Sequence, residues 1–273
     1  ISQQLQCYND RNTNKKIDMM LLDKDMEHLG SEINRLIDLY ITENRKRIQF
    51  EHEQQQAIAD ISHDLKTPLT SILGYIQMIE SRNTSGDERE EYVSIAKGHA
   101  KRLESLLKEF SEIGIIDSAD HQLKLERTNI KTVAIDVLMN FYDRFSEKNM
   151  EPIIQMPAYD VTIISDESAV TRVIENLLSN AITHSDGNIV ISLGEKDATA
   201  RLVIKNDAHT LTEENVDRMF DRFYMADQTR LGNSTGLGLS IAKSLMEKMN
   251  ARITGRLTDG QLIIVCEWKM EGN

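Results

Sequence analysis

Apolar residues recur at every seventh position along residues 58–79. The repeat consists of Ile58, Leu65, Ile72 and Ile79, with Ile61 and Ile76 close to the half-steps. Such a repeat predicts a helix that buries one narrow stripe against other helices. When Ile58 is placed at heptad position a, His63 falls at position f, which lies farthest from the stripe. We therefore expect the imidazole of His63 to be exposed on the outer face of this helix.

Residues 93–110 carry a second narrow stripe, in which steps of three and four alternate. Its members are Val93, Ala96, Ala100, Leu103, Leu107 and Phe110. The segment SRNTSGDERE contains turn-forming and capping residues, so a loop is expected between the two helices at residues 81–90. A hairpin of two such helices cannot bury both stripes by itself. We therefore predict that two copies of the chain close into a homodimeric four-helix bundle.

The residues before the hairpin show a similar alternation over residues 22–40. The stripe consists of Leu22, Met26, Leu29, Ile33, Leu36 and Tyr40. Its narrow width predicts a coiled coil with an identical chain, and the alternative is a surface helix without a partner.

Beyond residue 117 the pattern changes to short β-rich runs that alternate with amphipathic helices. Strands are predicted at residues 161–165, 188–193, 201–206, 251–257 and 261–268, and helices at 130–149, 167–184, 212–219 and 236–250. The fold class is therefore α+β and multidomain. We expect a helical coiled-coil segment over residues 1–50, a helical-hairpin domain over 51–117 and an α/β sandwich over 118–273.

Charge and cysteine content narrow the function further. The 273 residues carry a net charge of −12 with a pI near 5.1, so no basic surface is available for nucleic acid. Cys7 and Cys266 lie far apart without metal-ligand spacing, which favours a reducing compartment. No apolar run reaches the ~18–20 residues that cross a bilayer. Because the first residue is Ile1, we expect a piece of a longer protein.

The segment HDLKTP at residues 63–68 resembles the phosphoacceptor motif of bacterial sensor histidine kinases. An asparagine motif, an aromatic motif and a glycine-rich motif follow in the order that this family shows. The resemblance covers roughly residues 50–270. It implies that His63 accepts a phosphoryl group, that Asp64 orients the imidazole or takes its proton, and that Thr67 orients water for the reverse phosphatase reaction.

The helix VTRVIENLLSNAITHS corresponds to the asparagine motif. Asn176 and Asn180 are four residues apart and share one helix face. The resemblance implies that Asn180 is a ligand of Mg²⁺, a cation that prefers oxygen ligands, and that Asn176 lies beside the phosphates. Thr183 stands where the family usually has a basic residue, and His184 fits a position that often holds Tyr or His.

The adenine-binding motif departs most from the family pattern of Asp, any residue, Gly, any residue, Gly. Asn206, Ala208 and Thr210 occupy the three defined positions here. Asn206 can still accept a hydrogen bond from the adenine amino group through its carbonyl oxygen. Asp207, the next residue, is the alternative acceptor.

The segment MFDRFYMAD resembles the aromatic motif, in which Phe220, Phe223 and Tyr224 would anchor a mobile lid. Arg222 and Arg230 are candidate phosphate contacts, with solvated surface arginines as the alternative. A glycine-rich run then enters a helix, where main-chain N–H groups can surround phosphate oxygens. The candidate ATP-binding residues in this run are Gly232, Thr235, Gly236, Leu237 and Gly238.

The resemblance implies an ATP- and Mg²⁺-dependent protein-histidine kinase. Residues 1–50 would be a membrane-proximal signalling helix, and residues 118–273 would share the ATP-binding fold of gyrase, Hsp90 and MutL. His63 would pass its phosphate to an aspartate in the receiver domain of a response regulator. Missing N-terminal segments would anchor this cytoplasmic portion to the membrane. The alternatives are a scaffold with weak ATP binding or dominant phosphatase activity, and a gyrase-type ATPase, which HDLKTP disfavours.

Overall fold

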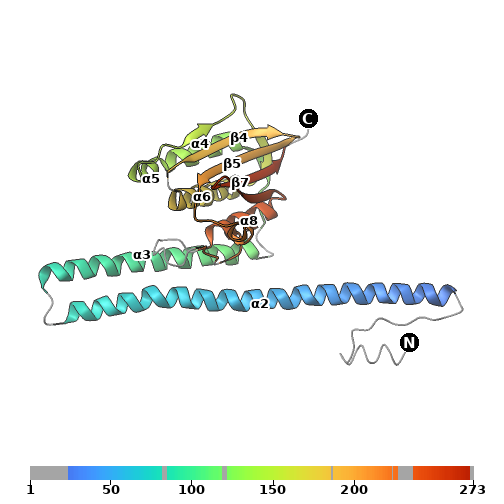
Figure 1. Ribbon diagram of the computed structural model, residues 1–273, viewed down its shortest axis with the longest axis horizontal. Helices are drawn as coiled ribbons and strands as arrows, with labels where there is room; N and C mark the ends of the chain where they lie inside the picture. Colours follow the sequence, from blue (N-terminus) through green and yellow to red (C-terminus); the bar gives the residue numbers. More distant parts are fainter. Residues whose placement is uncertain are drawn as a thin grey trace. The chain divides into compact units, whose positions relative to one another are not determined.

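The computed structural model describes residues 24–81, 85–118, 122–185, 187–222, 224–226 and 236–270. The chain forms two compact units, Ile1–Ser62 and His63–Asn273. The long helix α2 (Lys24–Glu80) continues without a break across residue 50, where the sequence pattern predicted a domain boundary (Figure 1). Its 57 residues include Pro68. In the part of the chain that the structure describes, no helix combines the length and apolar character that a membrane span requires.

The first unit contains the N-terminal part of α2. Leu29, Leu36 and Tyr40, which belong to the predicted coiled-coil stripe, are exposed in the single chain. These three side chains are open to a partner, Leu22 lies outside the described residues, and the coiled coil remains a prediction.

The second unit begins with the rest of α2 and with α3 (Gly86–Asp117). Helix α3 starts at a capping box, in which the Ser85 hydroxyl accepts from the main-chain N–H of Glu88 and the Glu88 carboxylate accepts from that of Ser85. The ring of Tyr75 on α2 lies 5.7 Å from that of Tyr92 and 6.3 Å from that of His99, which joins the two helices. The exposed members of the apolar stripes include Ile76, Val93, Leu107 and Phe110. Leu69 and Leu73 on α2, which lie outside the predicted stripe, are exposed as well.

The rest of the second unit is an α/β sandwich, which confirms the predicted fold class. Its main sheet has five strands in the order β2-β4-β5-β7-β6, and only the β2–β4 pair is parallel. The strands are β2 (Ile153–Gln155), β4 (Ile189–Lys196), β5 (Thr199–Asp207), β6 (Arg252–Thr258) and β7 (Gln261–Lys269). A separate antiparallel pair joins β1 (Glu126–Asn129) to β3 (Thr162–Ser165).

The helices of this domain are α4 (Ile130–Asn140), α5 (Tyr142–Glu147), α6 (Glu167–His184), α7 (Glu213–Arg218) and α8 (Gly238–Lys248). Helices α4, α6 and α8 pack on one face of the sheet (Figure 1). Their apolar sides meet alternate residues of the strands, because side chains alternate between the two faces of a sheet. One cross-strand row on this face is Ile191, Ile204 and Ile264, and the next is Leu193, Leu202 and Cys266.

Three predictions on the elements were wrong. The single helix expected over residues 130–149 is interrupted at Phe141, whose φ of −93° and ψ of −1° depart from helical values. Strand β1 was missed because ERTN is polar and buries only Thr128. Strand β2 was missed because it is a short edge strand with both faces exposed, so that it has no alternating pattern.

Candidate active site

The side chain of His63 lies on the outer face of α2, where it is 81% exposed. Its Nδ1 is 3.4 Å from Oδ1 of Asp64. The hydroxyl of Thr67 donates to the main-chain oxygen of His63 at 3.2 Å, one turn further along. The imidazole is therefore accessible to a large reactant, with one carboxylate oxygen beside Nδ1.

Helix α6, which carries the asparagine motif, starts at the N-cap residue Asp166. The Asp166 carboxylate accepts from the Ser168 hydroxyl at 2.6 Å and from the main-chain N–H of Ala169 at 3.0 Å and of Lys124 at 2.8 Å. Burial raises the pKa of Asp166, but these hydrogen bonds outweigh it and hold the pKa below its usual value. The cap thus defines the start of the helix on which Asn176 and Asn180 lie.

Asn176 brings the asparagine and glycine-rich motifs into contact. Its Oδ1 lies 3.3 Å from the position that a Cβ would occupy on Gly238, the first residue of α8. Its Nδ2 is buried and has no hydrogen-bond partner among the described residues. A buried donor without a partner is costly, and an oxygen of a bound phosphate is a suitable acceptor for it. The half-buried Asn180, one turn along α6, has an amide oxygen that suits Mg²⁺.

The entry into α8 needs a glycine for a conformational reason. Gly236 has a φ of +71°, which residues with a Cβ rarely adopt. Leu237 is buried, and its main-chain oxygen accepts from the Ser240 hydroxyl at 2.8 Å. Gly232 and Thr235, the other candidates in this run, lie outside the described residues, as do Phe223 and Arg230.

Asn206 and Asp207 lie on opposite faces of β5. Asn206 is 2% exposed and pairs across the sheet with Ile189 and Leu262, so it continues the face that the helices cover. The carboxylate of Asp207 instead accepts from Asn188 Nδ2 at 2.7 Å and from Gln261 Nε2 at 3.0 Å. Hydrogen bonds from Gln261 and Asn188 lower the pKa of Asp207 below its usual value, although burial opposes the shift.

The remaining predicted positions lie around α6 and α7. His184 is the last residue of α6. The Thr183 hydroxyl donates to the main-chain oxygen of Ser179 at 2.7 Å. Because threonine is uncharged, this position lacks the positive charge that the family usually has there. In the aromatic motif, Phe220 packs against the core, and the hydroxyl of Tyr224 accepts from Asn215 Nδ2 at 2.7 Å.

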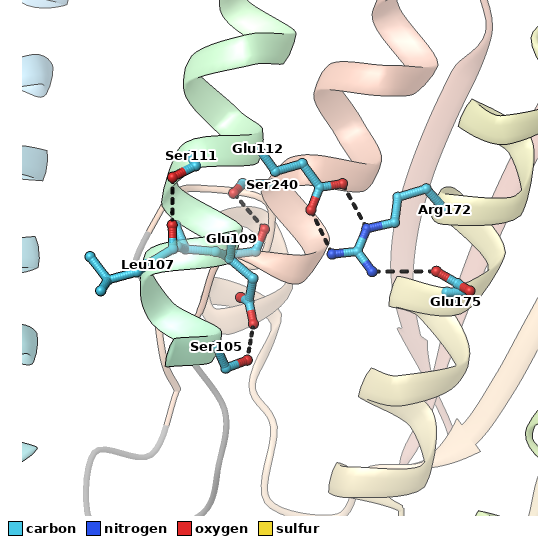
Figure 2. Close-up of polar contacts among 9 residues, drawn as sticks. Ser105, Leu107, Glu109, Ser111, Glu112, Arg172, Glu175 and Ser240 are labelled. Atoms are coloured by element: carbon cyan, nitrogen blue, oxygen red, sulfur yellow. Dashed lines mark hydrogen bonds and ion pairs between the residues drawn. The ribbon is translucent and has the colours of Figure 1, made fainter. Parts of the chain in front are cut away.

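One contact near the site was not predicted from the sequence. The guanidinium of Arg172 on α6 donates from Nε and Nη2 to the two carboxylate oxygens of Glu112 on α3, both at 2.6 Å. Figure 2 shows this pair, with Glu175 on the other side of Arg172 at 3.3 Å. The two partners are 60 residues apart, and no local pattern joins them.

Two family models match the chain in the order that the motifs suggested. Residues 53–119 match the "His Kinase A (phospho-acceptor) domain". Residues 165–270 match the "Histidine kinase-, DNA gyrase B-, and HSP90-like ATPase". The first contains His63, and the second contains both asparagines of α6 and the glycine-rich run.

Curated relatives and solved structures agree with these matches. The sensor histidine kinase YcbM of Bacillus subtilis is 30% identical over 78% of this chain and 72% of its own length. The sensor protein VanSC of Enterococcus gallinarum is 31% identical over 85% of this chain and 65% of its own length. The crystal structure of the histidine kinase ThkA in complex with the response regulator protein TrrA is 20% identical, covers 85% of this chain and 66% of that one, and has a TM-score of 0.69.

The similarity to ThkA supports the fold, and the similarity to YcbM, together with the two domain matches, supports the family. The chain spans about two thirds of the length of the first relatives that it matches. It belongs to the sensor histidine kinase family.

Proposed function

We propose that this chain is the kinase core of a two-component sensor, which uses ATP to phosphorylate His63 and then passes the phosphoryl group to an aspartate of a response regulator. The observation that carries the proposal is the contact of Asn176 with Gly238, which joins the asparagine and glycine-rich motifs beside an unpartnered amide donor. The same chain presents His63 in an exposed phosphoacceptor motif.

The contact between His63 and Asp64 supports a specific division of labour in the imidazole. In the neutral imidazole, a proton on Nδ1 can form a hydrogen bond to the Asp64 carboxylate. The lone pair of Nε2 is then free to attack. The new bond joins this nitrogen to the γ-phosphorus, while the bond from that phosphorus to the bridging oxygen of ATP breaks and ADP leaves with the electron pair. Asp64 then accepts the Nδ1 proton. Thr67, one turn from His63, would orient water in the reverse, phosphatase reaction.

The residues of the second unit fit a nucleotide with its metal ion. Asn176, Gly236, Leu237 and Gly238 would lie along the phosphates, and Asn180 would hold Mg²⁺. When bound, Mg²⁺ neutralises charge on the phosphate oxygens during transfer. The protein's own contribution is to position the γ-phosphoryl group and to exclude water from it.

Exposed apolar residues on both helices of the hairpin support a homodimer. Leu73 on α2 and Phe110 on α3 are examples, and a second copy would bury them in a four-helix bundle. ThkA, which shares the fold, is solved with a response regulator, and we propose a regulator receiver domain as the partner here. Attachment of the parent protein to a membrane remains a prediction from the family resemblance.

The departure at Ala208 and Thr210 favours a scaffold with weak ATP binding as the second candidate. Neither residue has a positive φ, so the main chain does not require glycine at these positions. The replacement therefore adds bulk without backbone strain, and the kinase remains the better-supported function.

Labelling with ATP that carries radioactive phosphorus at the γ position tests the proposal. The unmodified chain should become labelled, His63→Gln should lose the label, and His28→Gln should keep it as the matched control. An unlabelled wild-type chain would support the scaffold, and steady ATP hydrolysis that survives in His63→Gln would support the ATPase. A labelled product from mixed His63→Gln and Asn180→Ala chains would establish transfer across the dimer.

A further inference from the structure

The amide of Asn206 has a defined orientation near the end of β5. Its Nδ2 donates to the main-chain oxygen of Asp207 at 3.1 Å. Its Oδ1 accepts no hydrogen bond from the described residues and is not fully enclosed. An acceptor alone is thus presented on the face of the sheet that α6 and α8 cover.

The orientation of this amide depends on where the last residue of β5 lies. Asp207 ends the strand, and its main-chain N–H donates to the Asn188 oxygen at 3.3 Å. Side chains reinforce this position from both neighbouring strands. The carboxylate accepts from Asn188, which precedes β4, and from Gln261, which begins β7. We call this row of three side chains the Asp207 bridge.

The bridge is chemically suited to hold one geometry. An ionised carboxylate only accepts hydrogen bonds, so it selects the NH₂ groups of both neighbouring amides. Hydrogen bonds to a charged acceptor are also stronger than neutral ones. The Asp207 bridge therefore ties together the ends of three adjacent strands at the residue that holds the Asn206 amide.

We infer that Asp207 is a positioning residue that selects adenine over guanine by fixing the amide of Asn206 with its oxygen toward the base. This inference rests on the proposed function of the site. Adenine carries an amino donor at the ring position where guanine carries a carbonyl acceptor. A fixed Oδ1 attracts the former and repels the latter, whereas a freely rotating amide could present Nδ2 to guanine instead.

The test is the affinity of the 273-residue chain for ATP and for GTP, measured by titration calorimetry with Mg²⁺, alongside the kinetics of His63 labelling. Asp207→Ala removes the bridge. We expect the ratio of GTP to ATP dissociation constants to fall by roughly three- to tenfold, the range of one hydrogen bond. The KM for ATP should rise, while kcat changes little.

An exchange variant provides the control for a merely structural role. In Asn188→Asp combined with Asp207→Asn, the new amide can donate to residue 188 and accept from Gln261, so the row is rebuilt with the charge moved. This pair should restore the nucleotide ratio. Glu195→Ala, at the far exposed end of β4, should leave the ratio unchanged.

A ratio that stays at the wild-type value in Asp207→Ala would overturn the inference, as would equal losses for both nucleotides or a failure of the exchange pair. These results differ from a failure of the proposed function. In that case ATP binding and its dependence on Asp207 would remain measurable, while His63 would stay unlabelled.

Discussion

The ion pair between Glu112 and Arg172 should couple α3 to the core of the ATP-binding domain. We propose to remove each charge in turn with Glu112→Gln and Arg172→Gln, and then both together. The pair links the helix of the hairpin to the helix that carries Asn176 and Asn180 (Figure 2). Near it, Ile113 and Ile116 of α3 belong to the same hydrophobic core as α6.

The size of the effect follows from geometry and exposure. Exposed ion pairs contribute about 0–1 kcal/mol, whereas hydrogen bonds to charged groups contribute about 1.5–3 kcal/mol. The Arg172–Glu112 contact is bidentate, and the side chains of Arg172 and Glu112 are 30% and 23% exposed. Solvent therefore screens the pair in part, and we expect a coupling energy of about 1–2 kcal/mol in the double-mutant cycle.

Trp268 makes the measurement specific to this domain, because it is the chain's one tryptophan and is 2% exposed in the sheet core. Its fluorescence during urea unfolding should report the free energy of unfolding of the sandwich. The coupling should decrease when the ionic strength rises. Lys124 and Glu126 form the matched control, because their contact is 2.8 Å but their side chains are 81% and 45% exposed.

The control pair should couple more weakly than Glu112 and Arg172, because solvent screens exposed charges. If the cycle on Glu112 and Arg172 gives no more than this control, the pair does not contribute to the packing of α3 on the domain. A coupling that is insensitive to salt would show that the effect comes from side-chain packing and not from charge.

Two further predictions concern the second unit. Asp166→Ala should lower the free energy of unfolding by about 1–2 kcal/mol through loss of the α6 cap. The pKa of Asp166 is lowered in the folded state, so this contribution is present above the unfolded pKa of 3.8 and is lost as the pH falls below it. The stabilities of the wild type and the variant should therefore converge in acid. Convergence only on the alkaline side would contradict the assignment. Gly255→Val should destabilise the domain by about 1–3 kcal/mol because a Cβ there would lie 2.8 Å from Met219 Sδ. The same change at Gly194, which has open space, should cost less, and equal melting temperatures for the two variants would refute the packing argument.

Local patterns were sufficient for most of the elements, and they supplied the motifs from which the site is proposed. The heptad repeat around Ile58 predicted that His63 faces solvent, and its side chain is 81% exposed. The amphipathic pattern of residues 167–184 predicted α6 with its bounds. Such patterns succeed because a regular repeat of buried positions specifies both the element and its buried face.

The failures have the opposite cause. Strand β2 has no buried residue, and β1 has a single buried threonine, so neither has a periodic signal. The sequence also left Asn206 and Asp207 as alternatives for the adenine contact. The sheet register places the two side chains on opposite faces of β5, with Asn206 in a row with Ile189 and Leu262, and Asp207 in a row with Gln261.

The amino-acid sequence by itself determined the helical hairpin, the α/β sandwich and the motifs of a histidine kinase, since each depends on residues that are close together along the chain. Only the tertiary structure decided which groups from distant parts of the sequence meet. It placed Gly238 against Asn176, Arg172 against Glu112, and the Asp207 carboxylate between two amides. The physical reason is that such contacts depend on strand register and helix packing, and the whole core sets both of them together.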